Sequence, residues 1–101
     1  MTDFEELKFI AQFLCAKYNI TLEELKGRRN IRFYTDIRKK LVYLSKPISH
    51  DFEDIGIFIN RDRSTIYHYF IDIIERRKID DKLKSELNDL RMEYELYKNI
   101  N

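Results

Sequence analysis

Residues that form tight turns are scarce in this chain, which holds two Gly and one Pro among 101 residues. An antiparallel sandwich or barrel needs a turn about every 8–12 residues and relies on Gly and Pro to make it. The composition therefore disfavours an all-β fold and favours long helices. The length fits a single domain, 1–101, that can bury a core without disulfide bonds.

Capping patterns and apolar spacing predict an all-α fold of about six helices. Thr2 and Thr21 each precede a Glu by three residues, the spacing of a capping box at a helix start. Gly27 is expected to end the second helix in the left-handed conformation, and Pro47 to end the third. The predicted helices cover about 3–17, 22–27 and 31–45, a short stretch from Ser49 or Asp51 to Ile59, a segment capped by Asp62, and 80–98.

The third predicted helix, 31–45, has one apolar face and one basic face. The apolar side chains recur at helical spacing, with either Phe33 or Tyr34 completing the stripe. We expect Arg38 to point mostly outward with its two neighbours, Lys39 and Lys40.

The last predicted helix, 80–98, carries an apolar seam with heptad-like 4-3-4-3 spacing. Two heptads are fewer than a coiled coil usually needs, so two interpretations stay open. The seam packs on the chain's own helices, or it mediates association with a second copy. Its members are Leu83, Leu87, Leu90, Tyr94 and Tyr97.

The net charge of +1 hides a strongly basic block. Residues 26–46 carry eight Lys and Arg against Asp36 alone, whereas 1–25 and 47–74 are each acidic by three charges. Such asymmetry indicates an anionic partner such as nucleic acid. The simpler alternative is a solvated, Lys-rich helix face.

A short helix, the polar break 60–62 and a second helix with a polar first turn form the pattern of a helix-turn-helix. In that motif the second helix enters the major groove of DNA and its first residues meet base edges. Arg63 can donate to guanine, while Ser64 and Thr65 offer hydroxyl groups and His68 follows one turn later. An ordinary capped helix with a solvated first turn is the alternative.

Several segments of the chain also match one DNA-binding family in register, from about Phe9 to Leu90. The matching residues are Tyr18–Arg29, Arg38, Leu44, Ile55, Gly56 and Arg61–Ile66. They resemble the C-terminal DNA-binding domain (domain IV) of the bacterial replication initiator DnaA. The resemblance implies a Trp-repressor-like helix-turn-helix fold.

The resemblance also implies a role for each DNA-binding position. The signature after the turn would read bases and phosphates in the major groove, the basic loop would enter the adjacent minor groove, and one lysine would meet phosphate. Arg63 replaces the usual histidine of the family, and Asn30 replaces its usual minor-groove arginine, so Arg29 or Arg32 would substitute. The predicted DNA-binding residues are Arg28, Arg29, Arg32, Lys46, Arg61, Asp62, Arg63, Ser64, Thr65 and His68.

Other functional classes find little support in the sequence. A Gly-rich phosphate loop and a nucleophile–base set are missing, so we expect neither an ATPase nor any other enzyme. His50 and His68 lack the ligand spacing of a zinc site, and Cys15 is expected to be a buried structural thiol, so no metal or cofactor is predicted. Without a signal peptide or an apolar run of about 20 residues, we expect a cytoplasmic, nucleoid-associated protein with no membrane partner.

The sequence thus predicts a stand-alone, sequence-specific binder of double-stranded DNA at DnaA-box-like sites. It would regulate replication initiation or transcription without ATPase activity. The alternative is a protein-interaction module, either a decoy for a replication regulator or a homodimer formed through the C-terminal helix.

Overall fold

The computed structural model describes residues 3–46 and 51–100, and over these ranges the chain forms six helices and no strand. The all-α prediction is therefore confirmed. Thr2, Pro47, Ser49 and His50, which figured in the sequence predictions, lie outside the described residues. The helices are α1 (Asp3–Tyr18), α2 (Leu22–Lys26), α3 (Arg32–Ser45), α4 (Phe52–Ile59), α5 (Arg63–Ile79) and α6 (Asp81–Ile100).

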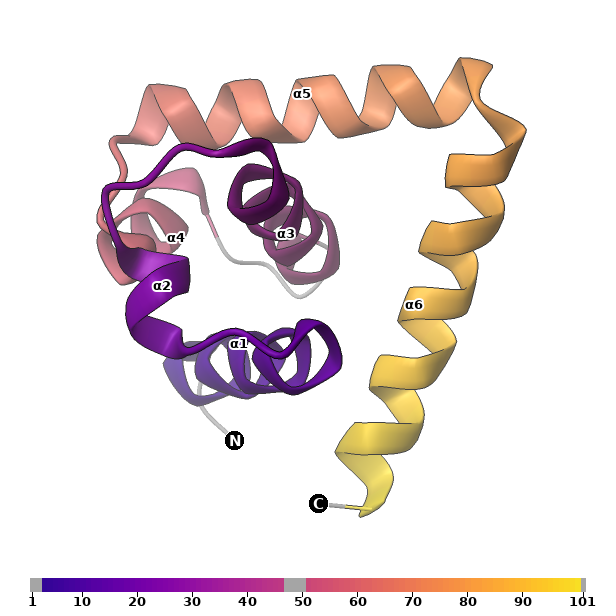
Figure 1. The fold of residues 1–101 in the computed structure, drawn as a ribbon, viewed down its shortest axis with the longest axis horizontal. Helices are drawn as coiled ribbons and strands as arrows, with labels where there is room; N and C mark the ends of the chain where they lie inside the picture. The colour runs from indigo at the N-terminus through magenta and orange to yellow at the C-terminus, as the bar shows by residue number, and fades with distance from the viewer. Residues whose placement is uncertain (1–2, 47–50, 101) are drawn as a thin grey trace.

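Helix α3 lies at the centre of the helix arrangement, packed against α1, α2 and α5 (Figure 1). Helix α5 runs along the edge of the group formed by α1 to α4, and α6 turns back from it at a sharp corner (Figure 1). The turn between α4 and α5 lies at the opposite edge of this view from α6 (Figure 1). The C-terminal helix therefore leaves that turn uncovered.

Apolar residues from all six helices form one continuous core. Tyr34, not Phe33, completes the buried stripe of α3, because Phe33 is half exposed. The most deeply buried members of the core are Leu7, Ile10, Ala11, Leu14, Leu25, Ile37, Leu41, Val42, Leu44, Ile55, Ile59, Ile66, Leu87, Leu90 and Tyr94.

The predicted seam of α6 is buried within the chain. Leu87, Leu90 and Tyr94 are almost fully inaccessible, and Tyr94 and Tyr97 form ring contacts with Phe9 and Phe13 of α1. Most of this seam therefore packs on the chain's own helices, and Tyr97 at its end stays partly exposed. Association with a second copy through the end of α6 stays a prediction.

Local capping explains where α2, α4 and α5 begin. Thr21 and Glu24 form the complete predicted capping box, with each side chain bonded to the other residue's backbone N–H. Asp51 caps α4, and Asp62 caps α5 as predicted. Each acceptor satisfies a backbone donor that the first helical turn leaves unpaired.

The prediction for Gly27 is wrong in its conformation. Its φ of −73° is ordinary extended backbone, so no left-handed residue ends α2. A Cβ at this position would lie 2.9 Å from the carbonyl oxygen of Glu23. Close packing of the backbone, rather than a positive φ, therefore favours glycine here.

The prediction that Arg38 points outward is also wrong. Its side chain is fully buried, and its guanidinium donates to the carbonyls of Glu24, Leu25, Gly27 and Arg29 at 2.7–3.1 Å. Burial lowers the pKa of Arg38, while carbonyl dipoles at the end of α2 favour its positive charge. Arg38 therefore fixes the path of the chain between α2 and α3.

Candidate nucleic-acid interface

The turn between α4 and α5 is very tight. Asn60 adopts the left-handed conformation (φ 59°), and the backbone N–H of Arg61 donates to the carbonyl of Gly56 at 2.9 Å. A Cβ at Gly56 would lie only 2.4 Å from the carbonyl oxygen of Arg61. Gly56 therefore permits the close approach that sets the position of α5 relative to α4.

Asp62 organises the first turn of α5. Its carboxylate accepts from the backbone N–H of Thr65 at 2.9 Å and from the hydroxyl of Ser64 at 3.0 Å. These hydrogen bonds hold the pKa of Asp62 below its ordinary value, so the group is ionised at neutral pH. Arg63, Ser64 and His68 are exposed around this capped turn, and Thr65 is half-buried.

The loop between α2 and α3 lies directly against this turn. The guanidinium of Arg61 donates to the carbonyl of Gly27 at 2.6 Å and to the side-chain oxygen of Asn30 at 3.2 Å. The side-chain amide of Asn60 donates to the carbonyl of Lys26 at 3.3 Å. Two segments more than 30 residues apart in sequence thus share one surface.

Three predicted DNA-binding arginines lie in this loop or at the start of α3. Arg28, Arg29 and Arg32 are all exposed, and Arg32 forms a long ion pair with Asp36 at 3.8 Å. The contacts of Arg61 with Gly27 and Asn30 hold the loop against the turn that precedes α5. Arg61 lies on the same surface, but its guanidinium donates hydrogen bonds to Gly27 and Asn30 of the loop.

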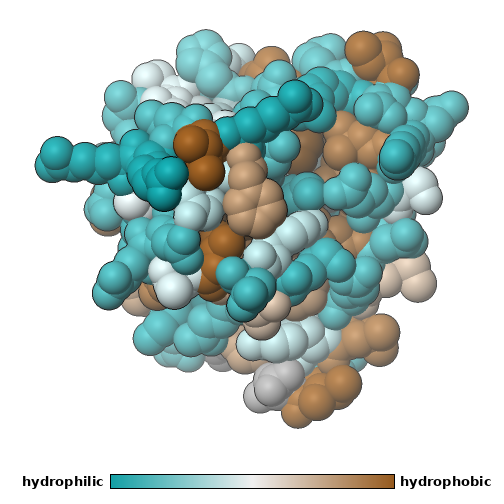
Figure 2. Space-filling view, in the orientation of Figure 1, coloured by the Kyte–Doolittle hydropathy of each residue, from teal (hydrophilic) through white to brown (hydrophobic). Residues whose placement is uncertain are grey.

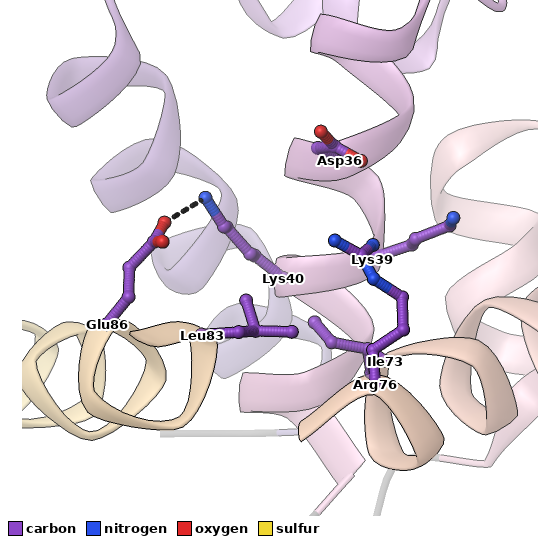
Figure 3. A pocket seen from close by; sticks show the side chains of 7 residues that line it. All are labelled: Asp36, Lys39, Lys40, Ile73, Arg76, Leu83 and Glu86. Carbon is purple, nitrogen blue, oxygen red and sulfur yellow. Dashed lines mark hydrogen bonds and ion pairs between the residues drawn. The ribbon is translucent and has the colours of Figure 1, made fainter. Parts of the chain in front are cut away.

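Two other cations of the basic block, Lys39 and Lys40, face the protein instead. Lys39 pairs with Asp72 on α5 at 2.8 Å and lowers the pKa of that carboxylate. Lys40 reaches Glu86 on α6, also at 2.8 Å (Figure 3). Both lysines are largely covered, so the prediction that they face mostly outward is wrong. These two ion pairs link α3 to α5 and to α6.

Lys46 ends α3 beside an aromatic cluster. Its ammonium lies 4.4 Å from the ring centroid of Phe52, and that ring contacts both Tyr67 and Phe70 of α5. A hollow lined by Phe52, Tyr67 and the first turn of α5 joins this cluster to the predicted reading residues. Lys46 and the hollow beside Arg63 therefore share the ring of Phe52.

Sequence reasoning missed Tyr67 as part of this surface. It is 47% exposed and lies one helical turn after Arg63. The spacing of four residues from Arg63 would have placed it on the same face.

Features that would indicate other chemistry are few in the described part of the chain. It contains no group of three or more His, Cys, Asp and Glu residues arranged to hold a metal ion. Cys15 is half-buried, and burial raises the pKa of its thiol, which keeps it protonated at neutral pH. Among the same residues, no helix combines the length and apolar character that crossing a bilayer requires.

Comparison with known proteins finds relatives named DnaA. No family model matches the chain. The chromosomal replication initiator protein DnaA of Caldanaerobacter subterraneus subsp. tengcongensis is 26% identical over 86 residues, and that of Deinococcus radiodurans is 29% identical over 87. These alignments cover 84% and 85% of this chain. The chain is similar to DnaA.

The similarity to DnaA concerns a limited part of that protein. The chain spans 19% of the length of either relative, and the DnaA of Thermoanaerobacter pseudethanolicus is matched to the same extent. This range is consistent with the resemblance to the C-terminal domain of DnaA found in the sequence.

Proposed function

We propose that this chain binds double-stranded DNA sequence-specifically, with α4, the 60–62 turn and α5 acting as a helix-turn-helix. The observation that carries the proposal is the contact of Arg61 with Gly27 and Asn30, which joins the basic loop to the start of α5. Similarity to DnaA supports the same function. The first turn of α5 would enter the major groove while the loop meets the neighbouring minor groove.

Each part of the surface has a distinct proposed task. Arg63 presents a planar fork of donors that matches the acceptors of guanine, and Ser64 and Thr65 contact neighbouring base edges or phosphates. Asp62 acts chiefly by holding this turn in shape, and His68 extends the surface by one turn.

The exposed cations would supply the affinity that depends on salt. Arg28, Arg29 and Arg32 are exposed and Lys46 is partly exposed over Phe52, whereas Arg38, Lys39 and Lys40 are engaged within the protein. The binding constant falls as salt rises, and each phosphate neutralised steepens the slope of log K against log salt concentration (the salt slope) by about 0.9. We therefore propose a slope close to that of four contacts rather than of the whole basic block.

The proposed biological role follows that of a DNA-binding module. The chain would occupy DnaA-box-like sites and so regulate replication initiation or transcription in the cytoplasm, associated with the nucleoid. It would act by binding alone, without enzymatic activity or a cofactor.

Substitutions in the two parts of the surface are expected to have different effects. Arg63→Ala and Ser64→Ala should each weaken binding to the preferred duplex by about 1–3 kcal/mol, with less effect on random duplexes, since they remove base contacts. Lys46→Ala should weaken binding to every duplex alike and make the salt slope shallower by about one unit. Quantitative gel shifts at two salt concentrations measure both effects.

Arg76→Ala is the matched control for loss of a cation. It lies at the other end of α5, where it pairs with Asp72 at 3.5 Å. Its substitution should leave both discrimination and salt slope close to those of the unsubstituted chain. Equal losses on preferred and random duplexes for Arg63, Ser64 and Lys46 variants would refute the proposed division of roles.

A further inference from the structure

Two large apolar side chains are exposed where the basic loop meets the start of α3. Ile31 is 44% exposed and Phe33 is 50% exposed, and the exposed Arg29 and Arg32 lie beside them in sequence. Figure 2 shows an apolar patch over the start of α3, framed by long, strongly hydrophilic side chains. Cations and exposed apolar groups are therefore interleaved on the surface proposed to face DNA.

The residue at the start of α3, Ile31, stabilises the helix less than a capping residue would. Ile31 occupies the N-cap position with extended backbone (φ −65°, ψ 149°), and no side chain caps the helix there. Ser, Thr, Asp and Asn are preferred at N-caps because they bond the free N–H groups of the first turn. An exposed isoleucine at this position gives up that hydrogen bond, which suggests that it serves another purpose.

The neighbouring polar residue is turned toward the protein. The side-chain oxygen of Asn30 accepts from Arg61 at 3.2 Å. Asn30 is thus tied to the 60–62 turn, whereas the next side chain, Ile31, extends toward solvent. The part of the loop that can enter a groove is therefore apolar at its centre and basic at its sides.

The apolar pair stands on a rigid support. Arg38 binds the loop carbonyls of Gly27 and Arg29 at 3.1 and 2.7 Å. The ring of Phe33 lies 5.8 Å from that of Tyr34, which is buried and whose hydroxyl donates to Glu24. A preorganised side chain loses little conformational entropy when it enters a partner.

Duplex DNA is the partner whose chemistry fits this arrangement. Proteins that deform DNA from the minor groove place apolar side chains between base steps, while flanking arginines contact the groove and the phosphates. We propose that Ile31, backed by Phe33, inserts as an apolar wedge into the minor groove, partly unstacks one base step and bends the duplex. This inference rests on the proposed DNA-binding function and adds a deformation of the DNA to it.

The test uses the full chain and a duplex recovered by selection from a random pool. The fluorescent base 2-aminopurine is placed at successive steps of the segment protected by the loop, because its emission rises when it unstacks. We expect emission to rise at least about twofold at one step, and a mismatch at that step to tighten binding about fivefold or more, because unstacking is already achieved. Ile31→Ser should abolish both effects, and Phe33→Ser should reduce them.

Ile79→Ser provides the matched control. Ile79 is 87% exposed at the end of α5, and its change from apolar to polar should alter neither effect. Far-UV circular dichroism checks that all three variants fold, and Ile31→Ser supplies a better N-cap than isoleucine.

The two proposals fail in different ways. Sequence-specific binding with no rise in emission, no gain from mismatches and an unchanged Ile31→Ser variant would overturn the wedge alone. That result would instead be consistent with Ile31 and Phe33 serving a protein partner. Failure to bind any duplex would overturn the DNA-binding function and the wedge with it.

Discussion

Replacing Arg38 with methionine should destabilise the protein by about 3–5 kcal/mol, because each buried backbone acceptor left without a donor costs about 1–3 kcal/mol. The guanidinium is fully buried and satisfies four backbone carbonyls between α2 and α3. Methionine fills similar space but leaves these acceptors without donors. Since a small domain has about 5–15 kcal/mol of stability, the loss should be plain in urea denaturation followed by circular dichroism.

Arg32→Met is the matched control for Arg38→Met. It makes the same chemical change six residues earlier, where the side chain is 87% exposed and pairs only loosely with Asp36. A surface pair of this kind contributes about 0–0.5 kcal/mol. Arg32→Met should therefore retain stability while weakening DNA binding, and equal stability of the two variants would contradict the role given to Arg38.

Gly56→Ala should destabilise the protein by about 1–3 kcal/mol, the usual cost of overpacking. The direction of this change in stability is informative, because alanine inside a helix is normally favoured over glycine by about 1 kcal/mol. Here the added Cβ would lie 2.4 Å from the backbone carbonyl oxygen of Arg61 and force the 60–62 turn away from α4. Thermal denaturation measures the change in stability, and weaker DNA binding should accompany it.

Ile57→Ala controls for substitution on α4. Ile57 adjoins Gly56 but is 69% exposed, so its truncation should cost much less. A Gly56→Ala protein more stable than the unsubstituted chain would show that the tight α4–α5 turn is wrongly described.

Features controlled by local sequence were the ones that could be predicted. Thr21, Asp51 and Asp62 each cap a helix through a donor only three residues away, so their residue type and spacing suffice. The seam of α6 likewise follows from helical periodicity. These signals fix where helices begin and which face is buried.

Features that depend on distant partners could not be predicted. Arg38 is buried because carbonyls 9–14 residues earlier converge on it, and nothing in α3 itself indicates this. Lys39 and Lys40 turn inward toward Asp72 and Glu86, which lie 33 and 46 residues away. Counting charge along the sequence treats every cation as free, and so it overstated the basic surface.

The candidate interface includes features that could be predicted from the sequence and features that could not. Juxtaposition of the basic loop with the start of α5 followed from the resemblance, and the contacts of Arg61 place the two segments together. The exposure of Ile31, Phe33 and Tyr67 did not follow, because apolar residues are ordinarily expected inside.

The most direct test of sequence-specific DNA binding is selection of duplexes from a random pool, followed by measurement of Kd for the recovered sequence and for a shuffled one. We expect selection to converge on one motif, and the chain to bind it about a thousandfold or more tighter than the shuffled duplex at physiological salt. Arg63→Ala should remove much of this difference. A pool that never converges, or equal Kd values for both duplexes, would contradict the claim that the first turn of α5 reads DNA sequence.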